Sequence, residues 1–579
     1  MIKNAYICGT LFAGRRERNE GESVGEANTD KLRIMRKTIC IALAALMVAG
    51  TVSGQSKVSE GSKSFKLGQW VEIQNGILKE LNRVYVDSLQ LDRIQRVGID
   101  AMLDDLDPYT QYIPEEDEED LEMLLNKSYG GFGAVIYKPD KESNVIVNEP
   151  YKGSPADKLG FRCGDEITAI DGVPVQGLTA AECTTKMKGK PGTSVVFTVK
   201  KVYTGEIKDV TVVRERIKLP DVEYAGMLDD GTTGYILQSG FTEGVAADVK
   251  AAVQRLKAQG MQKLVLDLRN NGGGLLQEAV NIVSIFVPKG SVVVTAKGKD
   301  DRSSLEYKTT TDPVDTQLPV VVLVNSGTAS SSEIVAGALQ DFDRATIMGS
   351  RTYGKGLVQS IRPLPYNGKL KVTTAKYYTP SGRCVQAIDY SRRNEDGSVG
   401  HIPDSLTREF KTAHGRTVRD GGGITPDVTL KNQEYSRLTY SVVMSGIVEQ
   451  YALEFVRKHP AIAPLKEFRF TDADYKDFVE FAKGKEFDYR SSAKTYFDQV
   501  KRELESDGLA ESMKEQIEAL DKAIDMDKET FLNLKKDEII PFIEEEIVVR
   551  YYFQEAGIEV RLRTDEQLKE ALEKPLIQI

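Results

Sequence analysis

The stretch Asn325–Gln359, NSGTASSSEIVAGALQDFDRATIMGSRTYGKGLVQ, is the most informative part of this sequence. An apolar run, Leu318–Val324, precedes it and predicts a buried β-strand. The strand ends in small residues and a serine cluster, after which Glu333–Gln340 predicts the start of a helix. A second short strand, predicted over 345–348, leads into the glycine-flanked lysine of Tyr353–Gly356. We expect this arrangement to bring a serine nucleophile beside a lysine base.

Ser330 and Lys355 are the candidates for these two roles. A serine hydroxyl becomes a good nucleophile only when a nearby base takes its proton. A lysine can be that base if burial lowers its pKa from about 10.4 toward neutrality, and serine–lysine pairs are a known variant of the catalytic triad. In an extended strand Lys355, Leu357 and Gln359 share one face, so we expect Gln359 to orient the amine. The histidines lie in no glycine-rich or strand-end context: His401, His414 and His459.

Two other interpretations fit parts of this stretch. Ser330 and Glu333 match a helix capping box, which is compatible with a nucleophile at a helix N-terminus. The segment from Gly349 to Lys355 nearly matches a phosphate-binding P-loop. Gly356 replaces the required Ser or Thr, however, and no helix signal follows, which argues against nucleotide binding.

Residues 1–54 indicate a leader. A positive start at Arg36-Lys37 and an apolar segment over Thr38–Gly50 precede small residues at Val52–Gly54, as in a signal peptide. Residues 1–34 are largely polar, so we expect Met35 to be the true start. The apolar segment is short for a membrane span, and an uncleaved anchor is the alternative. In either case we expect an exported protein of the periplasm or cell envelope, membrane-associated if the leader is retained.

The composition is ordinary for a soluble globular protein. The 579 residues allow three or four domains, with 40% hydrophobic and 28% charged residues. The net charge of −10 argues against a nucleic-acid partner. No metal or cofactor is expected, because the cysteines beyond the leader lack metal-like spacing: Cys163, Cys183 and Cys384.

Two segments precede the core. Apolar residues at helical spacing from Trp70 to Val84 and over Ile94–Leu106 predict a helical arm, residues 65–127, with the tryptophan in a core. Residues 128–217 instead predict short strands, turns and one helix. Here Gly130–Ile136, GGFGAVI, puts a glycine loop before a strand. Backbone N–H groups of such a loop can hold a terminal carboxylate while the peptide adds a strand to the sheet edge, although a hairpin turn is the plain alternative.

Residues 218–432 predict the core domain. Strands over 234–237 and Lys263–Leu268, with a helix over Ala246–Gln259 between them, predict an α/β layer. The second strand leads into Asp267–Gly274, DLRNNGGG, whose glycines let amides point at a developing oxyanion. A strand-to-helix turn is the alternative.

Residues 433–579 form a charged extension without a chemical motif. Long helices are predicted over Met513–Leu534 and Asp537–Ala556. A packing scaffold is the default interpretation, and the alternatives are homo-oligomer formation, caging of the active site or binding of an adaptor.

These motifs resemble those of the carboxyl-terminal processing (tail-specific) peptidases, which are serine–lysine proteases with a built-in PDZ domain. The matching segments are Thr328–Ile334, Tyr353–Gly356, Leu106–Thr110, Thr373–Arg383 and Gly421–Asp427. The resemblance implies an α+β multidomain fold: a crotonase-like α/β peptidase core with an inserted PDZ domain, an N-terminal helical arm and a C-terminal helical extension.

The resemblance also implies roles for single residues. Ser330 is the expected nucleophile, Lys355 the base and Gln359 the third member. The expected oxyanion hole pairs the amide of Ser331 with that of Gly273 or Gly274. The expected contacts for a peptide carboxylate are Gly131, Phe132, Gly133 and Ala134. Lys188 stands where the family often has arginine and is either a ligand sensor or a solvated lysine. Asp341 either buttresses the site or is a surface residue.

The expected function is that of an exported serine endopeptidase whose PDZ domain recognises the free C-termini of protein or peptide substrates. Hydrolysis would proceed through an acyl-enzyme. Two other classes stay open at this point. One is a non-catalytic PDZ scaffold that only binds tails, and the other is a crotonase-like acyl-transfer enzyme.

Overall fold

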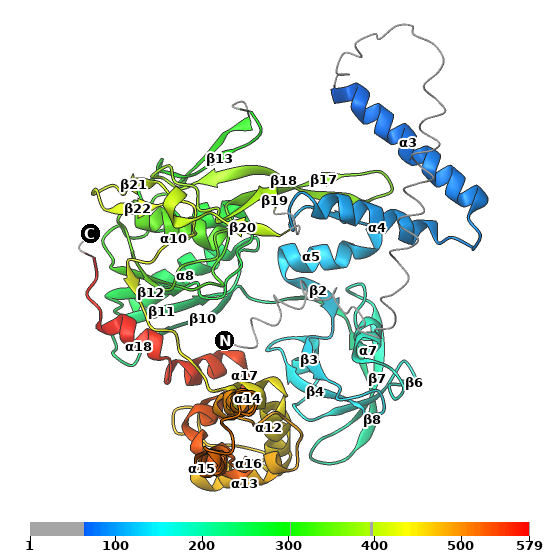
Figure 1. Cartoon of the computed structure of the whole chain (residues 1–579), viewed down its shortest axis with the longest axis vertical. Helices are drawn as coiled ribbons and strands as arrows, with labels where there is room; N and C mark the ends of the chain where they lie inside the picture. The colour runs from blue at the N-terminus through cyan, green and yellow to red at the C-terminus, as the bar shows by residue number, and fades with distance from the viewer. Residues whose placement is uncertain (1–62, 301–302, 394–397, 578–579) are drawn as a thin grey trace. The chain divides into compact units, whose positions relative to one another are not determined.

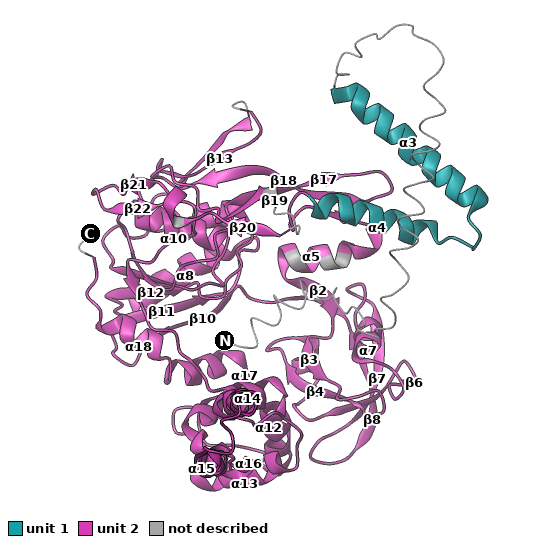
Figure 2. Cartoon of the chain, viewed as in Figure 1, with its two compact units in different colours: residues 1–105 teal, residues 106–579 magenta. Residues whose placement is uncertain are grey.

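The computed structural model describes residues 63–300, 303–393 and 398–577. Figure 1 labels the helices and strands. The described chain separates into two compact units, with the boundary between Asp105 and Leu106 (Figure 2). The signal-peptide pattern and Met35 lie outside the described residues. None of the described helices combines the length and the hydrophobicity that crossing a bilayer requires.

In the first unit, the described residues from Lys63 onward form two helices, α3 (Lys63–Val84) and α4 (Leu91–Asp104). Both were predicted from their apolar spacing. The expectation that Trp70 lies in a core is wrong, because 67% of its surface is exposed and α3 buries none of its residues. The apolar residues of α3 therefore follow a helical period without the packing that usually accompanies it.

The second unit is organised around a six-stranded sheet in the order β10-β11-β12-β15-β16-β23. All neighbours are parallel except β10 and β11. The strands are β10 (Val222–Met227), β11 (Thr233–Gln238), β12 (Lys263–Asp267), β15 (Val320–Val324), β16 (Thr346–Gly349) and β23 (Val428–Thr429). Their connections contain α8 (Val245–Ala258), α9 (Leu276–Val283) and α10 (Ser331–Asp341).

Helices cover both faces of this sheet, which explains why its strands are continuous apolar runs. Alternate residues of β15 show the division: Val320 and Val322 pack in one apolar cluster with α8, α9 and α10. Val321 and Leu323 pack in a second cluster with residues from α17 and α18. Helices α17 and α18 thus form a layer against this sheet, and Figure 1 shows α18 beside β10–β12.

A second sheet, with the order β1-β18-β13-β14 and β17 paired to β18, lies in the same unit. Its strands are β1 (Gln111–Ile113), β13 (Val292–Lys297), β14 (Leu305–Lys308), β17 (Leu357–Pro363) and β18 (Lys369–Tyr378). The smaller elements nearby in sequence are η1 (Glu115–Asp117), α5 (Glu118–Asn126), β19 (Ile388–Arg393), β20 (Val399–His401), η3 (Asp404–Leu406), β21 (Glu409–Lys411) and β22 (Thr417–Arg419). This sheet carries the segment that follows Lys355.

The binding module, as we call the expected PDZ domain of residues 128–217, has the sheet order β3-β4-β5-β7-β8, and β6 pairs with β5. Its elements are β3 (Ala134–Tyr137), β4 (Val145–Pro150), α6 (Pro155–Lys158), β5 (Glu166–Ile170), β6 (Val173–Pro174), α7 (Ala180–Met187), β7 (Ser194–Lys200) and β8 (Ile207–Val213). A two-stranded ribbon of β2 (Ser128–Gly131) and β9 (Glu215–Lys218) joins the two ends of the module. β3 is an edge strand, which is the position that strand addition by a peptide requires.

The C-terminal extension is helical, as predicted, but its boundaries differ. Its helices are α11 (Arg437–Met444), α12 (Ile447–Lys458), α13 (Asp472–Lys483), α14 (Ser492–Ser506), α15 (Lys514–Ile524), α16 (Lys528–Leu534), α17 (Lys536–Leu562) and α18 (Glu566–Glu573). The single helix expected over 513–534 is two helices, because Asp527 caps a new N-terminus at α16. α17 runs on to Leu562 through a break at Phe553 (φ 66°, ψ 178°).

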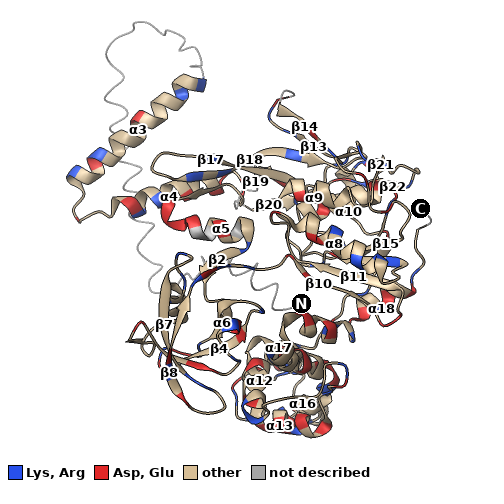
Figure 3. Cartoon of the chain, turned by 180° about the vertical axis from the view of Figure 1, so that it is seen from behind, with Lys and Arg blue, Asp and Glu red and all other residues tan. Residues whose placement is uncertain are grey.

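Acidic and basic side chains are interspersed over most elements (Figure 3). The acidic run at Glu115–Glu122 falls on η1 and α5, as expected for a solvated helix start.

Candidate active site

Ser330 lies between the end of β15 and the first turn of α10. Its backbone is unusual for a non-glycine residue, with φ 56° and ψ −117°. Such conformations cost about 1–3 kcal/mol and persist only where surrounding contacts impose them. The predicted capping box with Glu333 is present at this position. The capping role of the segment and a strained, positioned serine therefore occur together.

Glu333 connects the segment that carries Ser330 to the segment that carries Lys355. Its side chain is fully buried, and one carboxylate oxygen accepts hydrogen bonds from the N–H groups of Ser330 (2.9 Å) and Lys355 (2.8 Å). The other oxygen accepts from the Thr352 hydroxyl (2.6 Å) and the Gly354 N–H (2.8 Å). Burial raises the pKa of Glu333, whereas these four donors stabilise its carboxylate form. One buried side chain thus sets the spacing between the two segments.

Tyr377, from β18, connects the same two residues from their carbonyl side. Its buried hydroxyl donates to the carbonyl oxygen of Lys355 (2.6 Å) and lies 3.1 Å from that of Ser330. Burial raises the pKa of Tyr377 well above its usual value, so the hydroxyl keeps the proton that it donates. Ser330 and Lys355 are consequently held at both their N–H and their C=O groups.

Lys355 is mostly buried, and its amine has the properties required of a base. Burial is the main cause that lowers its pKa from 10.5 to about 8, and the charge of Lys371 lowers it further. Glu333 and Asp107 act in the opposite direction. The Nζ atom lies 4.3 Å from the centre of the Tyr109 ring, which covers it. A substantial fraction of neutral amine is therefore present near pH 8.

Gln359 lies on β17, two residues beyond Leu357, but Lys355 precedes this strand and a register shift falls between Val358 and Gln359. The uninterrupted strand expected to put Lys355, Leu357 and Gln359 on one face is therefore not present. Its amide nitrogen donates to the hydroxyl of Thr373 (3.2 Å) on the neighbouring strand β18. The side-chain amide of Gln359 thus contacts Thr373. The expected role of Gln359, to orient the amine of Lys355, stays a prediction.

The loop after β12 lies against Ser330. A side chain at Gly273 would place its Cβ atom 2.7 Å from the Cβ of Ser330 and 2.8 Å from the amide nitrogen of Ser331. Gly273 also has φ +93°, so glycine is required for both reasons. Its own N–H donates to the Asn271 side chain (2.9 Å). The Gly273 amide thus already has an acceptor, which makes Gly274 the better candidate of the two.

Several hydrogen bonds join this loop to the serine segment. The carbonyl of Asn271 accepts from the Ala329 N–H (3.0 Å) and the Ser332 hydroxyl (2.9 Å). The carbonyl of Gly274 accepts from the Ser331 hydroxyl (2.8 Å). A shift of the loop would therefore move the segment that carries Ser330.

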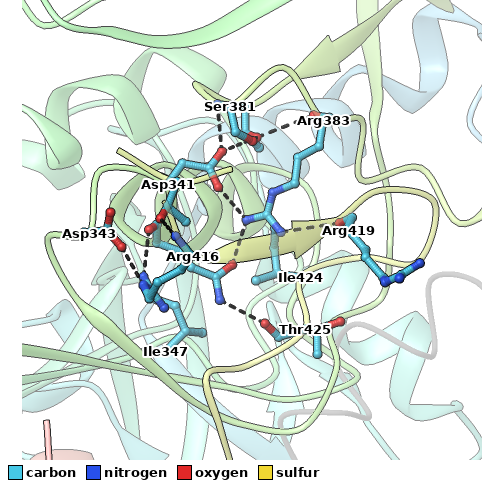
Figure 4. A network of polar contacts seen from close by, with 12 residues as sticks. Asp341, Asp343, Ile347, Ser381, Arg383, Arg416, Arg419, Ile424 and Thr425 are labelled. Atoms are coloured by element: carbon cyan, nitrogen blue, oxygen red, sulfur yellow. Dashed lines mark hydrogen bonds and ion pairs between the residues drawn. The ribbon is translucent and has the colours of Figure 1, made fainter. Parts of the chain in front are cut away.

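Asp341, at the last turn of α10, is buried, so the surface alternative is wrong. It forms an ion pair with the buried Arg383 (2.8 Å) and accepts hydrogen bonds from Thr379 and Ser381 (Figure 4). Arg383 also donates to Gln340 (2.7 Å). This network fixes the C-terminal end of the helix whose N-terminal end carries Ser330.

The predicted carboxylate loop joins β2 to β3. The carbonyl of Phe132 accepts from the Ala156 N–H (2.8 Å), and that of Gly133 accepts from the Tyr151 N–H (2.9 Å). Because C=O and N–H point in opposite directions across a trans peptide, the amides of Gly133 and Ala134 face away from these contacts. They are therefore oriented as carboxylate donors would be.

The other predicted residues of the binding module have structural contacts. The Phe132 ring is buried and packs edge-on against Phe197, with 5.0 Å between ring centres. Gly131 pairs with Glu215 in the β2–β9 ribbon. The Lys188 amine lies 5.3 Å from the centre of the Tyr129 ring. Lys188 thus has a neighbour inside the module, and its role toward a ligand stays a prediction.

Sequence reasoning missed some of the residues that surround the candidate pair. Glu333 was interpreted only as a cap, and Tyr377, Tyr109 and Lys371 were given no role. The sequence carries a signal for Glu333 in its fixed offset from Ser330. Tyr109 and Tyr377 lie in segments that match the family, but their contacts with the site, like the influence of Lys371, arise only when these segments meet in the tertiary structure.

Three segments of the chain match known protein families. Residues 232–391 match the peptidase family S41, residues 146–201 match a PDZ domain, and residues 438–574 match the family "Probable PDZ-protease, C-terminal helical domain". The "Carboxy-terminal-processing protease" of Bartonella bacilliformis is 36% identical over 317 residues, which cover 54% of this chain and 71% of that protein. A "Probable CtpA-like serine protease" of Staphylococcus aureus is 32% identical over 409 residues, 70% of this chain and 72% of that protein.

Among solved structures, a photosystem II D1 C-terminal processing protease is 26% identical and aligns with 61% of this chain and 91% of its own, with a TM-score of 0.32. The sequence relatives, rather than this structural alignment, decide the assignment, because each exceeds 30% identity over more than two thirds of its own length. The chain belongs to the carboxy-terminal-processing proteases of peptidase family S41 and is a serine-type protease with a PDZ domain and a C-terminal helical domain.

Proposed function

We propose that this protein is an exported endopeptidase of the periplasm or cell envelope that captures protein substrates by their free C-termini. Ser330 is the nucleophile, Lys355 the general base and Gln359 the residue that orients the amine. The core is crotonase-like, and its oxyanion hole consists of the Ser331 amide and a glycine amide, Gly274 in preference to Gly273.

The proposed reaction has two halves. The neutral amine of Lys355 takes the proton of the Ser330 hydroxyl while the oxygen attacks the peptide carbonyl. The resulting ammonium gives this proton to the leaving amine, which departs and leaves an ester on Ser330. Water then attacks the ester as Lys355 takes its proton, and the same proton returns to the serine oxygen as the carboxylate product leaves.

One observation carries this proposal: Glu333 and Tyr377 bind the backbones of both Ser330 and Lys355. A serine and a lysine that were structural neighbours by chance would not need a shared buried carboxylate and a shared buried hydroxyl. The lowered pKa of Lys355 supports the same roles, since a base must be neutral near the working pH.

The PDZ domain supplies the substrate preference in this proposal. The outward amides of Gly133 and Ala134 bind the terminal carboxylate, with Gly131 and Phe132 shaping the loop. The free edge of β3 pairs with the substrate tail as an additional strand. An apolar tail is preferred, because strand addition places alternate side chains on the apolar surface of the module.

Digestion of an unstructured protein with a free apolar C-terminus tests this proposal. The wild type is compared with Ser330→Ala and Lys355→Ala, and the substrate is used with a free and with an amidated end. We expect both variants to lose cleavage while retaining peptide binding, and we expect amidation to slow the wild type. Cleavage by Ser330→Ala would refute the assignment of the nucleophile. Equal rates on free and amidated ends would refute recognition of the terminal carboxylate.

A further inference from the structure

The last helix of the chain contacts the base of the candidate oxyanion loop. Arg269, two residues before Asn271, has a buried guanidinium that forms ion pairs with Asp267 (2.5 Å) and with Asp565 (2.6 Å). Gln567 supplies another acceptor at 3.0 Å. Asp565 and Gln567 belong to the N-terminus of α18 and are almost 300 residues away in sequence. An arginine held by a bidentate carboxylate has a fixed orientation.

Asp565 has two structural tasks. One of its oxygens accepts from the Leu568 N–H (2.9 Å) and caps α18, and both oxygens accept from Arg269. Burial would raise the pKa of Asp565, but the charge of Arg269 outweighs this effect and holds the pKa below its usual range. The pair is therefore charged at neutral pH, and it is dry enough for the attraction to be strong.

The orientation of Arg269 bears on the serine. Arg269 is followed directly by the loop whose Asn271 and Gly274 carbonyls bind the Ser330 segment. On the far side of Arg269, Asp267 accepts from the Tyr235 hydroxyl (2.7 Å), which anchors the end of β12. Among the described residues, this network contains two carboxylates, Asp267 and Asp565. Asp267 comes from β12, whereas Asp565 comes from the C-terminal helix α18.

We propose that Asp565 is a positioning residue for catalysis, which acts through Arg269 to hold the oxyanion loop against Ser330. The C-terminal helix α18 then completes the active site, although none of its residues touches substrate. This inference rests on the proposed roles of Ser330 and the loop after β12. It also means that any displacement of α18 lowers turnover without altering the PDZ domain.

Asp565→Asn tests the inference in the full-length protein. Asparagine caps a helix as well as aspartate does, so this change removes the charge and keeps the cap. The matched control is Asp527→Asn, because Asp527 caps α16 through Thr530 (2.7 Å) without an arginine partner in a catalytic loop. Steady-state cleavage of a C-terminal peptide substrate, its pH profile, and inhibition by a peptide aldehyde are measured for both.

We expect kcat of Asp565→Asn to fall about 10- to 100-fold, because small displacements of a reacting group have effects of this size. The aldehyde, which forms a tetrahedral adduct that needs the oxyanion hole, should bind more weakly by a similar factor. The KM of Asp565→Asn and the midpoint of its pH profile should equal those of the wild type. The control Asp527→Asn should have the kcat and the aldehyde affinity of the wild type. A purely structural role would lower the fraction of active enzyme but leave the aldehyde affinity of the remainder unchanged, which would overturn the inference.

Two further variants distinguish a folding defect and a failure of the proposed function from a failure of this inference. If Asp565→Asn does not fold, Gln567→Met decides: a loss in kcat of about 2- to 10-fold supports the inference, and no loss overturns it. Ser330→Ala is assayed in parallel. Residual cleavage by Ser330→Ala would show that the proposed function fails, whereas an inactive Ser330→Ala together with a fully active Asp565→Asn would refute only the role of Asp565.

Discussion

Replacing Lys355 with methionine should abolish proteolysis and at the same time stabilise the protein at neutral pH. The structure lowers the pKa of this amine from 10.5 to about 8, mainly by burial. Below pH 8 the amine is protonated in the folded and in the unfolded chain, so the folded state bears the whole cost of burying the charge. Above pH 10.5 both forms are neutral and the cost vanishes. Relative to the variant, the wild type must therefore gain stability as the pH rises.

The size of the effect follows from the shift. A lowering from 10.5 to about 8 corresponds to about 3 kcal/mol at pH 7. At pH 9.5 linkage leaves about 1.4 kcal/mol of this cost. The advantage of Lys355→Met should accordingly shrink by about 2 kcal/mol between the two pH values, an upper limit because the amine is partly exposed.

Differential scanning calorimetry at pH 7 and pH 9.5 measures this change. Lys355 lies in the expected core domain, residues 218–432. For a domain of about 150–250 residues, about 2 kcal/mol corresponds to roughly 4–8 °C in the difference between variant and wild-type Tm. The control is Lys376→Met, which removes an exposed lysine from β18. A Tm difference that is independent of pH would show that Lys355 is not a buried, weakly basic amine, and would remove the physical basis for its role as base.

Four further results are expected. The kcat of the wild type should rise with pH around a midpoint near 8, since only the neutral form of Lys355 accepts a proton; a flat profile between pH 6 and 9.5 would contradict this. Lys371→Met should move that midpoint upward in the same titration, because the charge of Lys371 lowers the pKa of Lys355. Tyr377→Phe should lower kcat about 5- to 30-fold by removing a hydroxyl shared by two carbonyls, whereas Tyr378→Phe, from the neighbouring position, should have wild-type kinetics. Gly273→Ala should lose at least 100-fold in kcat/KM, because its Cβ would collide with the serine segment; activity near that of the wild type would contradict the position of this loop.

Much of the local structure follows from the sequence alone. The apolar run before Asn325 predicts β15, and the serine cluster with Glu333 predicts the start of α10, both of which the structure confirms. The predicted helix over 246–259 is α8, within one residue at each end. These features are readable because helix and strand periods, caps and glycine positions depend on residues close together in the chain.

The errors arose where apolar spacing or residue type alone was used to predict a helix boundary or the burial of a side chain. Trp70 follows a helical period but lies on an exposed helix, and the single helix expected over 513–534 is interrupted before Asp527. Asp341 could not be distinguished from a surface residue, because its partner Arg383 comes from a separate segment. The spacing of apolar residues predicts which face of a helix or strand is apolar. Only the folded chain determines which residues pack against that face.

The sequence by itself determined the family and the candidate pair Ser330 and Lys355, and it predicted a loop that binds a terminal carboxylate. Only the tertiary structure decided what surrounds that pair: the carboxylate of Glu333, the hydroxyl of Tyr377, and the ion pair of Arg269 with Asp565. The physical reason is that a pKa, a buried charge and the position of a loop depend on burial and on partners that are distant along the chain. No local spacing can specify such partners, because they meet only when the sheets and helices have packed.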